Sequence, residues 1–216
     1  QHLPELKFLL PIAQTTSIEQ IKNFASPKNP IAQEYPAAIQ TIIQNKENKD
    51  WHLLITKNKT KIHLYSNQPA HHIIRKCDLA LTTVGANTAE LGALGVPMIV
   101  IVPTQHISVM QAWDGILGII SRLPGIKRIL GELISLWNMR KSKFLAWPNI
   151  SAGRMIIPEK IGIIYPKDIA LEAVEWIQSP QRLQGQKEDL QSIRGKSGAV
   201  ELLTKEIIKL IPSSFI

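Results

Sequence analysis

Short hydrophobic and alternating runs predict strands in the first half of the chain. They cover residues 7–12, 51–56, 61–66, 78–83 and 97–102. The last of these runs is apolar at every position, which is typical of a strand buried on both faces of a parallel sheet. The link at residues 57–60 is short enough for a hairpin between the second and third strands.

Hydrophobic residues at helical spacing predict helices along the whole chain. The predicted helices cover residues 17–25, 31–44, 69–76, 86–94, 108–123, 124–137, 166–179, 181–194 and 197–211. Ser17 stands where an N-cap is expected and Glu19 lies in the first turn, so both favour a helix start. In residues 31–44 the apolar positions are 31, 35, 38, 39, 42 and 43, which follows a helical period.

Helices and strands alternate through residues 68–102, and this order predicts the fold class. It indicates an α/β fold with a Rossmann-like, doubly wound parallel sheet and flanking helices. We therefore expect residues 1–104 to form a Rossmann-like core. Residues 105–143 are then a helical insertion. Residues 144–216 hold the sequence block at residues 145–159, which is described below, and the C-terminal helices.

Composition and charge narrow the class of protein. The 216 residues are 44% hydrophobic, which excludes a disordered chain. Lys and Arg number 25 against 17 Asp and Glu, so the net charge is +8. Aromatic residues are only 6% and do not interleave with a basic stripe, which disfavours nucleic-acid binding. The single cysteine, Cys77, excludes an intrachain disulfide, fits a reducing compartment and is expected in the core.

The sequence shows neither a membrane span nor a leader pattern. No apolar run reaches the roughly 18 residues that a spanning helix needs. The first residues are polar, are broken by Pro4 and lack an initiator Met. We therefore expect the chain to begin after a cleavage or to be an excerpt from a longer protein.

The segment after the strand at residues 78–83 carries the candidate chemistry. Gly85 lets the backbone approach a phosphate closely, and the first amides of the next helix favour an anion. Thr88 adds a hydroxyl, and Glu90 has a carboxylate that is able to accept bonds from two sugar hydroxyls. The same pattern also fits a plain strand-to-helix turn, in which Gly85 serves the backbone and Glu90 complements the helix dipole.

Two sequence blocks carry a resemblance to a known family. The first is Gly85-x4-Glu90-x4-Gly95-x-Pro97, which follows an Asp78-Leu79-Ala80-Leu81 strand and precedes an apolar one. The second contains Pro148-Asn149-x-x-Ala152-Gly153-Arg154, followed by Pro158-Glu159. These blocks resemble, in the same order, the nucleotide-sugar half of two-domain (GT-B) glycosyltransferases and within them the lipid-A-disaccharide synthase family. The resemblance covers residues 60–212 well and residues 1–59 loosely.

The resemblance implies an activity and a set of site residues. Members of the family transfer an acylated glucosamine from a UDP-sugar to an acylated sugar acceptor, with UDP as leaving group and no metal or other cofactor. By this resemblance Glu90 holds the ribose hydroxyls of UDP. The residues expected near the diphosphate or the donor are Gly85, Ala86, Asn87, Thr88, Asn149 and Arg154.

The sequence departs from the family in several respects. The loop that opens the family's donor domain is absent, so the resemblance implies that the N-terminal part of the core at residues 1–104 is missing. The family's catalytic carboxylate lies in an N-terminal domain to which nothing in these residues corresponds. We therefore expect this chain to supply the UDP-sugar-binding half and to be inactive alone. Val84 stands where the family has a small hydroxyl residue. Two alternatives stay open: a non-catalytic nucleotide-sugar- or membrane-binding relative and, less favoured because of the second block, a UDP-sugar epimerase of the same fold.

Residues 105–143 are longer than the family norm and suggest a membrane contact. Apolar residues at helical spacing with basic flanks suit the surface of an anionic membrane. The residues expected to touch it are Trp113, Ile116, Leu117, Ile120, Arg122, Lys127 and Arg128. Packing on the sheet or on a partner subunit is the alternative. We expect a cytoplasmic protein at the inner face of a bacterial-type membrane, where acylated substrates lie, and the family resemblance suggests a homodimer with exchanged C-terminal helices.

The histidines favour no metal site. His71 and His72 are neighbours in a predicted helix, and neighbouring helical residues do not share a face. His106 follows a predicted strand and is expected to be a loop histidine on the ligand side of the sheet.

Overall fold

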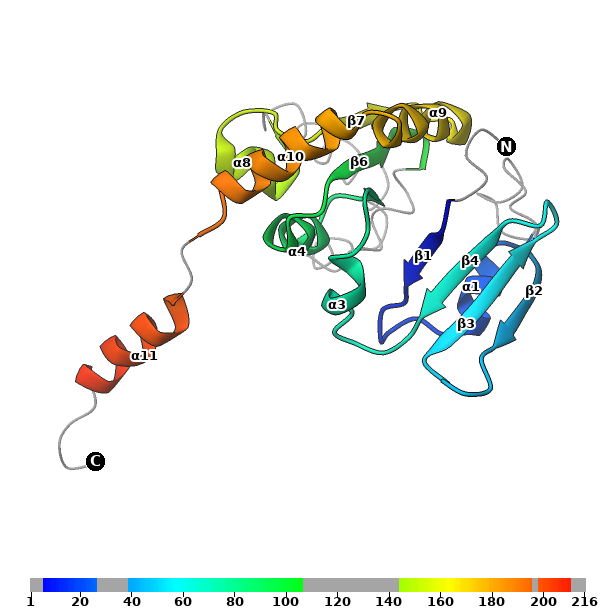
Figure 1. Ribbon diagram of the computed structural model, residues 1–216, viewed down its shortest axis with the longest axis horizontal. Coiled ribbons are helices and arrows are strands. Elements are labelled where there is room, and N and C mark those ends of the chain that lie inside the picture. The colour runs from blue at the N-terminus through cyan, green and yellow to red at the C-terminus, as the bar shows by residue number, and fades with distance from the viewer. Residues whose placement is uncertain (1–5, 27–38, 107–143, 196–197, 211–216) are drawn as a thin grey trace, which may run out of the picture.

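The chain forms an α/β fold, as the sequence predicts, with its strands in two sheets (Figure 1). The computed structural model describes residues 6–26, 39–106, 144–195 and 198–210. Within these residues, a four-stranded mixed sheet has the order β1-β4-β3-β2, and a three-stranded parallel sheet has the order β5-β6-β7. The strands before residue 66 therefore lie outside the parallel, Rossmann-like sheet that the sequence predicts.

The mixed sheet combines parallel and antiparallel pairs. Its strands are β1 (Phe8–Pro11), β2 (Ile39–Gln44), β3 (Trp51–Thr56) and β4 (Lys61–Tyr65). The short link between β3 and β4 makes a hairpin, so these strands pair antiparallel, whereas β1 pairs in parallel with β4. Helix α1 (Ile18–Phe24) packs on one face, over a core of Ile12, Leu54 and Leu64.

Helix α1 begins where the sequence predicts. The Ser17 hydroxyl accepts a hydrogen bond from the Gln20 amide at 3.1 Å, and the Gln20 side chain accepts one from the Ser17 amide at 2.7 Å. This reciprocal pair is a capping box, which satisfies two amides that the helix itself leaves free.

The predicted helix at residues 31–44 is wrong over residues 39–44, which form β2; residues 31–38 lie outside the described part of the chain. Strand β2 pairs antiparallel with β3 through a β-bulge between Ile39 and Thr41. Residues three apart normally face opposite sides of a strand, but the extra residue of a bulge restores the same side. Ile39 and Ile42 consequently both pack on the core, so a bulged strand reproduces the spacing of a helix.

The parallel sheet is built on a largely buried central strand. Met98, Ile99 and Val100 of β6 (Met98–Pro103) are 0% exposed. Strand β6 lies between β5 (Ala80–Thr82) and β7 (Glu159–Gly162), and α4 (Ala86–Leu94) is the crossover from β5 to β6. These elements confirm the predicted strands and helix of the segment that carries the candidate chemistry.

Helices pack against the parallel sheet and complete its core. Leu190 joins the buried cluster around β6, and the buried Gln186 accepts a hydrogen bond from the Met98 amide at 2.6 Å. The remaining elements are α3 (His71–Ile74), η1 (Thr104–His106), α8 (Trp147–Ala152), α9 (Pro166–Ile177) and α10 (Pro180–Ser192). The helices predicted at residues 69–76, 166–179 and 181–194 are therefore confirmed, with shorter bounds.

Helix α11 (Ala199–Leu210) confirms the last predicted helix and extends away from the body of the molecule (Figure 1). It exposes a set of large aliphatic side chains, from Ile208 at 51% to Leu210 at 82%. Its other exposed members are Leu202, Leu203 and Ile207. A helix with this much exposed apolar surface has a face that the rest of the described chain does not cover.

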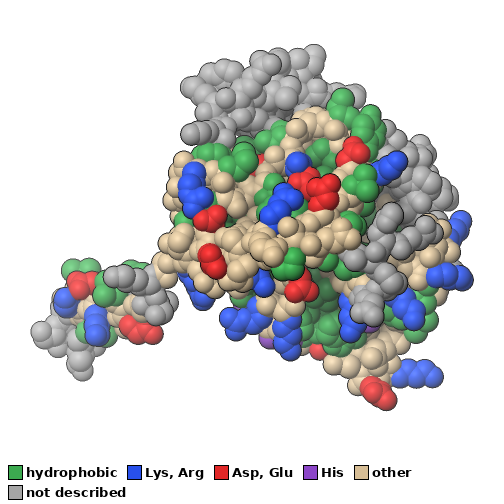
Figure 2. Space-filling model, turned by 45° about the horizontal axis from the view of Figure 1, so that its top comes forward, with side chains coloured by type: hydrophobic (Ala, Val, Ile, Leu, Met, Phe, Trp, Pro, Cys, Tyr) green, Lys and Arg blue, Asp and Glu red, His purple; other side chains and the backbone are tan. Residues whose placement is uncertain are grey.

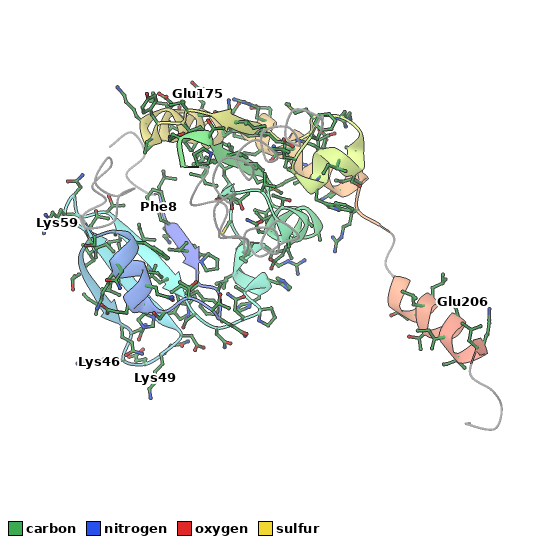
Figure 3. All side chains as sticks on the ribbon, turned by 180° about the vertical axis from the view of Figure 1, so that it is seen from behind. Phe8, Lys46, Lys49, Lys59, Glu175 and Glu206 are labelled. Atoms are coloured by element: carbon green, nitrogen blue, oxygen red, sulfur yellow. The ribbon has the colours of Figure 1, made fainter. Side chains whose placement is uncertain are left out.

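Lysines project from both ends of the mixed sheet (Figure 3). Lys46 and Lys49 lie in the β2–β3 loop at one end, and Lys59 lies in the β3–β4 turn at the other. On the face of the molecule in Figure 2, basic side chains are interspersed with acidic ones rather than gathered into one continuous patch. On this face the described basic side chains therefore have the pattern of an ordinary solvated surface.

The predicted membrane contact falls on residues that the structure does not describe. Trp113, Ile116, Leu117, Ile120, Arg122, Lys127 and Arg128 all lie in the range 107–143, outside the described residues. Among the helices that are described, none has the length and hydrophobicity needed to cross a bilayer.

Candidate functional site

The turn from β5 into α4 depends on Gly85. Its backbone angles are φ 151° and ψ −168°, a region that residues with a side chain rarely adopt. A Cβ added at this position would lie 2.9 Å from the Asn87 side-chain oxygen. Gly85 is therefore required by the backbone at the carboxyl end of a parallel strand, the edge of the sheet at which ligands bind in open α/β folds.

The first turn of α4 presents backbone amides that the described chain leaves open. Within the described residues, the amides of Gly85, Ala86 and Asn87 have no hydrogen-bond acceptor. The Asn87 side chain is turned back toward the strand, where it donates to the Thr82 hydroxyl and to the Thr83 carbonyl. The start of α4 thus keeps the positive end of its helix dipole and free donors for an anion.

Glu90 lies on the same face of α4 as Ala86, one turn further along. Residues four apart share a helix face, and helical side chains lean toward the N-terminus, so the Glu90 side chain leans toward the start of α4. Its Oε1 lies 2.7 Å from Nε2 of His71, at the start of α3. The Glu90 side chain is 42% exposed, which leaves it accessible to a ligand.

Thr88 does not offer a free hydroxyl. Its side chain is fully buried and donates to the Gly85 carbonyl at 2.8 Å. The same oxygen accepts a bond of 3.3 Å from the Trp147 amide, which is the first amide of α8. Thr88 therefore ties α4 to α8, and its hydroxyl is engaged within the protein.

Glu159 closes the N-terminus of α8. Its carboxylate accepts the Leu145 amide at 2.9 Å and the Ala146 amide at 2.9 Å. The next amide, that of Trp147, is bound by Thr88, and Pro148 has none. A carboxylate at this position also stabilises the positive end of the helix dipole. Anion binding at the start of α8 would have to displace these contacts.

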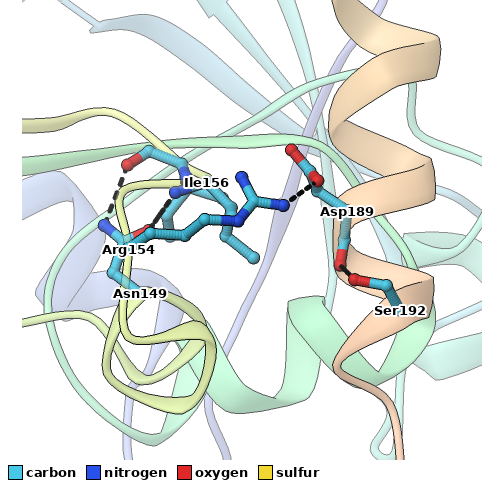
Figure 4. A network of polar contacts seen from close by, with 6 residues as sticks. Asn149, Arg154, Ile156, Asp189 and Ser192 are labelled. Carbon is cyan, nitrogen blue, oxygen red and sulfur yellow. Dashed lines mark hydrogen bonds and ion pairs between the residues drawn. The ribbon is translucent and has the colours of Figure 1, made fainter.

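Asn149 is a buried residue whose side-chain hydrogen bonds hold the second block together (Figure 4). Its side chain is 0% exposed and makes four hydrogen bonds. The amide nitrogen donates to the Ile157 carbonyl at 2.9 Å and to Glu159 at 2.7 Å, and the oxygen accepts from the Ile156 amide at 2.7 Å and the Ile157 amide at 2.9 Å. These bonds use the full capacity of an asparagine side chain, so none remains for a ligand.

Arg154 follows the end of α8 and forms an ion pair with Asp189 of α10 (Figure 4). Its side chain is 59% exposed. No hydrogen bond or ion pair among the described residues joins Arg154 or Asn149 to Gly85 or Glu90. The structure thus brings Gly85, Ala86, Asn87 and Glu90 together at one helix start, and gives Thr88, Asn149 and Arg154 contacts within the chain.

Two residues of these networks have no role assigned in the sequence interpretation. Glu159 appears there only as part of the second block, although an acidic residue ten positions after Asn149 is its direct partner. His71 is considered only as a metal ligand, although it contacts Glu90. Hydrophobic periodicity carries no signal for either contact, because each contact joins polar side chains of two different elements.

Among the described residues, no hydrogen bond or ion pair joins the remaining titratable candidates to Glu90. His72 contacts the Tyr65 hydroxyl at 3.5 Å, so the two adjacent histidines have different partners. Cys77 packs against the core around β6, as the sequence predicts, and burial followed by the nearby Asp78 raises the pKa of its thiol. His106 ends η1, just after β6. Among the described residues, no cluster of His, Cys, Asp and Glu side chains is arranged to hold a metal ion.

Comparisons with known proteins find no match, so a function is assigned from the geometry of this site. No protein-family model matches the chain, no curated protein matches it, and no solved structure matches it.

Proposed function

We propose that this chain binds the UDP-sugar donor of a glycosyltransferase that resembles lipid-A-disaccharide synthase. The observation that carries the proposal is the start of α4, where Gly85, Ala86 and Asn87 present free amides and Glu90 stands one turn along on an exposed face. Amides at a helix N-terminus suit a diphosphate, and a carboxylate suits the two hydroxyls of a ribose. The diphosphate and the ribose of a nucleoside diphosphate therefore each have a group in this chain that is suited to bind them.

In the proposed reaction an acylated glucosamine passes from the UDP-sugar to an acylated sugar acceptor. The bond between the sugar and the diphosphate breaks, and negative charge develops on the departing UDP. Oriented amides stabilise such charge without reorganisation at the moment of reaction. The proposal gives this chain donor binding and leaving-group stabilisation at α4, and no residue of the chain is assigned as the general base.

A second candidate is a relative that binds a nucleotide-sugar without transferring it. One observation favours it: Thr88, Asn149 and Arg154, which the family resemblance implies near the donor, are engaged in contacts within the chain. The two candidates differ in turnover rather than in binding. Release of UDP from an acylated UDP-glucosamine in the presence of an acylated sugar phosphate supports the transferase, whereas binding without release in the full-length protein supports the second candidate.

The proposed partners include a membrane surface and a second copy of the chain. The basic and apolar residues of 105–143 motivate the first, and co-sedimentation with vesicles containing anionic lipid tests it. The exposed aliphatic side chains of α11 motivate the second, because exchange of this helix between copies would bury them. Light scattering with and without residues 198–216 tests the dimer.

The donor site is tested by calorimetric titration with UDP. We expect Glu90→Ala to weaken UDP binding by about 2–4 kcal/mol, because two hydrogen bonds to a charged carboxylate are lost. Glu175→Ala, which removes an exposed carboxylate from α9, is the matched control and should bind UDP like the unaltered chain. The proposal fails if UDP does not bind or if both variants bind it equally well.

A further inference from the structure

His71 makes a contact that the proposed donor site does not explain by itself. Its Nε2 lies 2.7 Å from Oε1 of Glu90, across the interface between α3 and α4. Among the described residues this is the one polar contact of the Glu90 carboxylate, and it leaves Oε2 without a protein donor. One oxygen is therefore held by the protein while the other is open.

The contact contributes little to folding. The side chains of His71 and Glu90 are 52% and 42% exposed, and pairs between exposed side chains add little to the stability of a protein. Helix α3 is four residues long, and no side chain caps its start. The contact adds little to stability and lies beside a candidate ligand site. Its main effect is therefore on the orientation of the Glu90 side chain.

A free glutamate side chain samples several rotamers, and binding a ligand must select one of them. Because His71 fixes Oε1 in advance, the carboxylate already has one orientation when the ligand arrives. The lean of helical side chains toward the N-terminus directs that orientation toward the start of α4. Pre-ordering of this kind strengthens binding without adding any contact to the ligand.

We infer that His71 is a positioning residue that orients Glu90 toward the vicinal hydroxyls of a ribose, and so makes the site selective for ribonucleoside diphosphates. The inference rests on the proposed function. It predicts selectivity of a particular kind: His71 matters for a ligand with ribose hydroxyls and has no effect on a ligand that lacks them.

The test compares the affinities of UDP and 2′,3′-dideoxy-UDP, measured by calorimetry. We expect the unaltered chain to prefer UDP, and His71→Ala to reduce that preference about three- to tenfold, the effect of ordering one flexible side chain. His71→Gln, whose amide also donates to a carboxylate, should restore most of the preference. His72→Ala is the matched control, because His72 contacts Tyr65 instead of Glu90. Affinity for dideoxy-UDP should be the same in all variants.

A double variant separates positioning from a general loss of structure. If His71 acts through Glu90, adding His71→Ala to Glu90→Ala should leave the UDP affinity unchanged relative to Glu90→Ala alone. The inference is overturned if His71→Ala keeps the full preference for UDP, or if it weakens UDP and dideoxy-UDP equally. Failure of the unaltered chain to bind UDP overturns the proposed function and this inference with it.

Discussion

The starts of α4 and α8 are both helix N-termini within sequence blocks that resemble the same family, yet their polar groups are used in opposite ways. At α8 the amides of Leu145, Ala146 and Trp147 are bound by Glu159 and Thr88. At α4 the amides of Gly85, Ala86 and Asn87 have no acceptor among the described residues. The protein binds these three amides at α8, whereas it leaves the three at α4 open.

The difference teaches how to interpret a sequence block that contains polar residues. Asparagine, glutamate and arginine in such a block suggest a ligand site, but the same residue types stabilise a loop when their bonds are made internally. The block around α8 connects a helix start, a strand and α10 through Asn149, Glu159 and Arg154. We conclude that this block holds the domain together, and we therefore place the proposed ligand site at α4.

The largest expected effect that separates the two regions is on stability. Asn149→Ala removes the four hydrogen bonds of a buried side chain and leaves the amides of Ile156 and Ile157 unsatisfied. We expect a loss of about 3–5 kcal/mol in the free energy of unfolding, measured by chemical denaturation. Asn87→Ala, at the open helix start, should cost only about 1 kcal/mol. Equal losses in the two variants would contradict the contrast.

An intermediate effect is expected at the two glycines that flank α4. Gly85→Ala places a side chain at φ 151° and should cost about 1–3 kcal/mol of stability, together with most of the UDP affinity. Gly95→Ala, at the other end of the helix, has φ 70° and open space around the added carbon. It should cost about 1 kcal/mol and leave UDP binding intact. Thermal unfolding and titration with UDP together check both results, and retained UDP binding in Gly85→Ala would argue against the site.

The smallest effect is expected at Arg154. Its ion pair with Asp189 is 59% exposed on the arginine side, and such pairs contribute about 0–1 kcal/mol. Arg154→Ala should therefore reduce the free energy of unfolding by less than about 1 kcal/mol and change UDP affinity less than about twofold. Asp189→Asn is the control that breaks the same pair from the other side. A tenfold loss of UDP affinity in Arg154→Ala alone would indicate that Arg154 belongs to the ligand site.

The sequence predicts much of the fold because local patterns determine much of it. The capping of α1 by Ser17 and the buried strand β6 follow from residue type and spacing alone. Strand β2 is missed because a bulge gives Ile39 and Ile42 the spacing of a helix face. The separation of the strands into two sheets depends on pairing between distant segments, for which periodicity carries no signal.

The candidate site is predictable in part for the same reason. Gly85 and Glu90 follow from the order strand, glycine and helix, which is a local pattern. The internal use of Thr88 and Asn149 is not predictable in this way, because their partners Trp147 and Glu159 lie on other elements. The role of His71 is missed because its contact joins two helices that are separated along the chain.

The measurement that tests the contrast most directly is amide hydrogen exchange, followed residue by residue with and without saturating UDP. Amides bound within the structure exchange slowly, and free amides exchange fast until a ligand covers them. We predict that the amides of Gly85, Ala86 and Asn87 exchange fast in the free protein and slowly with UDP. Those of Leu145, Ala146 and Trp147 should be slow in both states. Protection by UDP at α8, with no change at α4, would contradict the account.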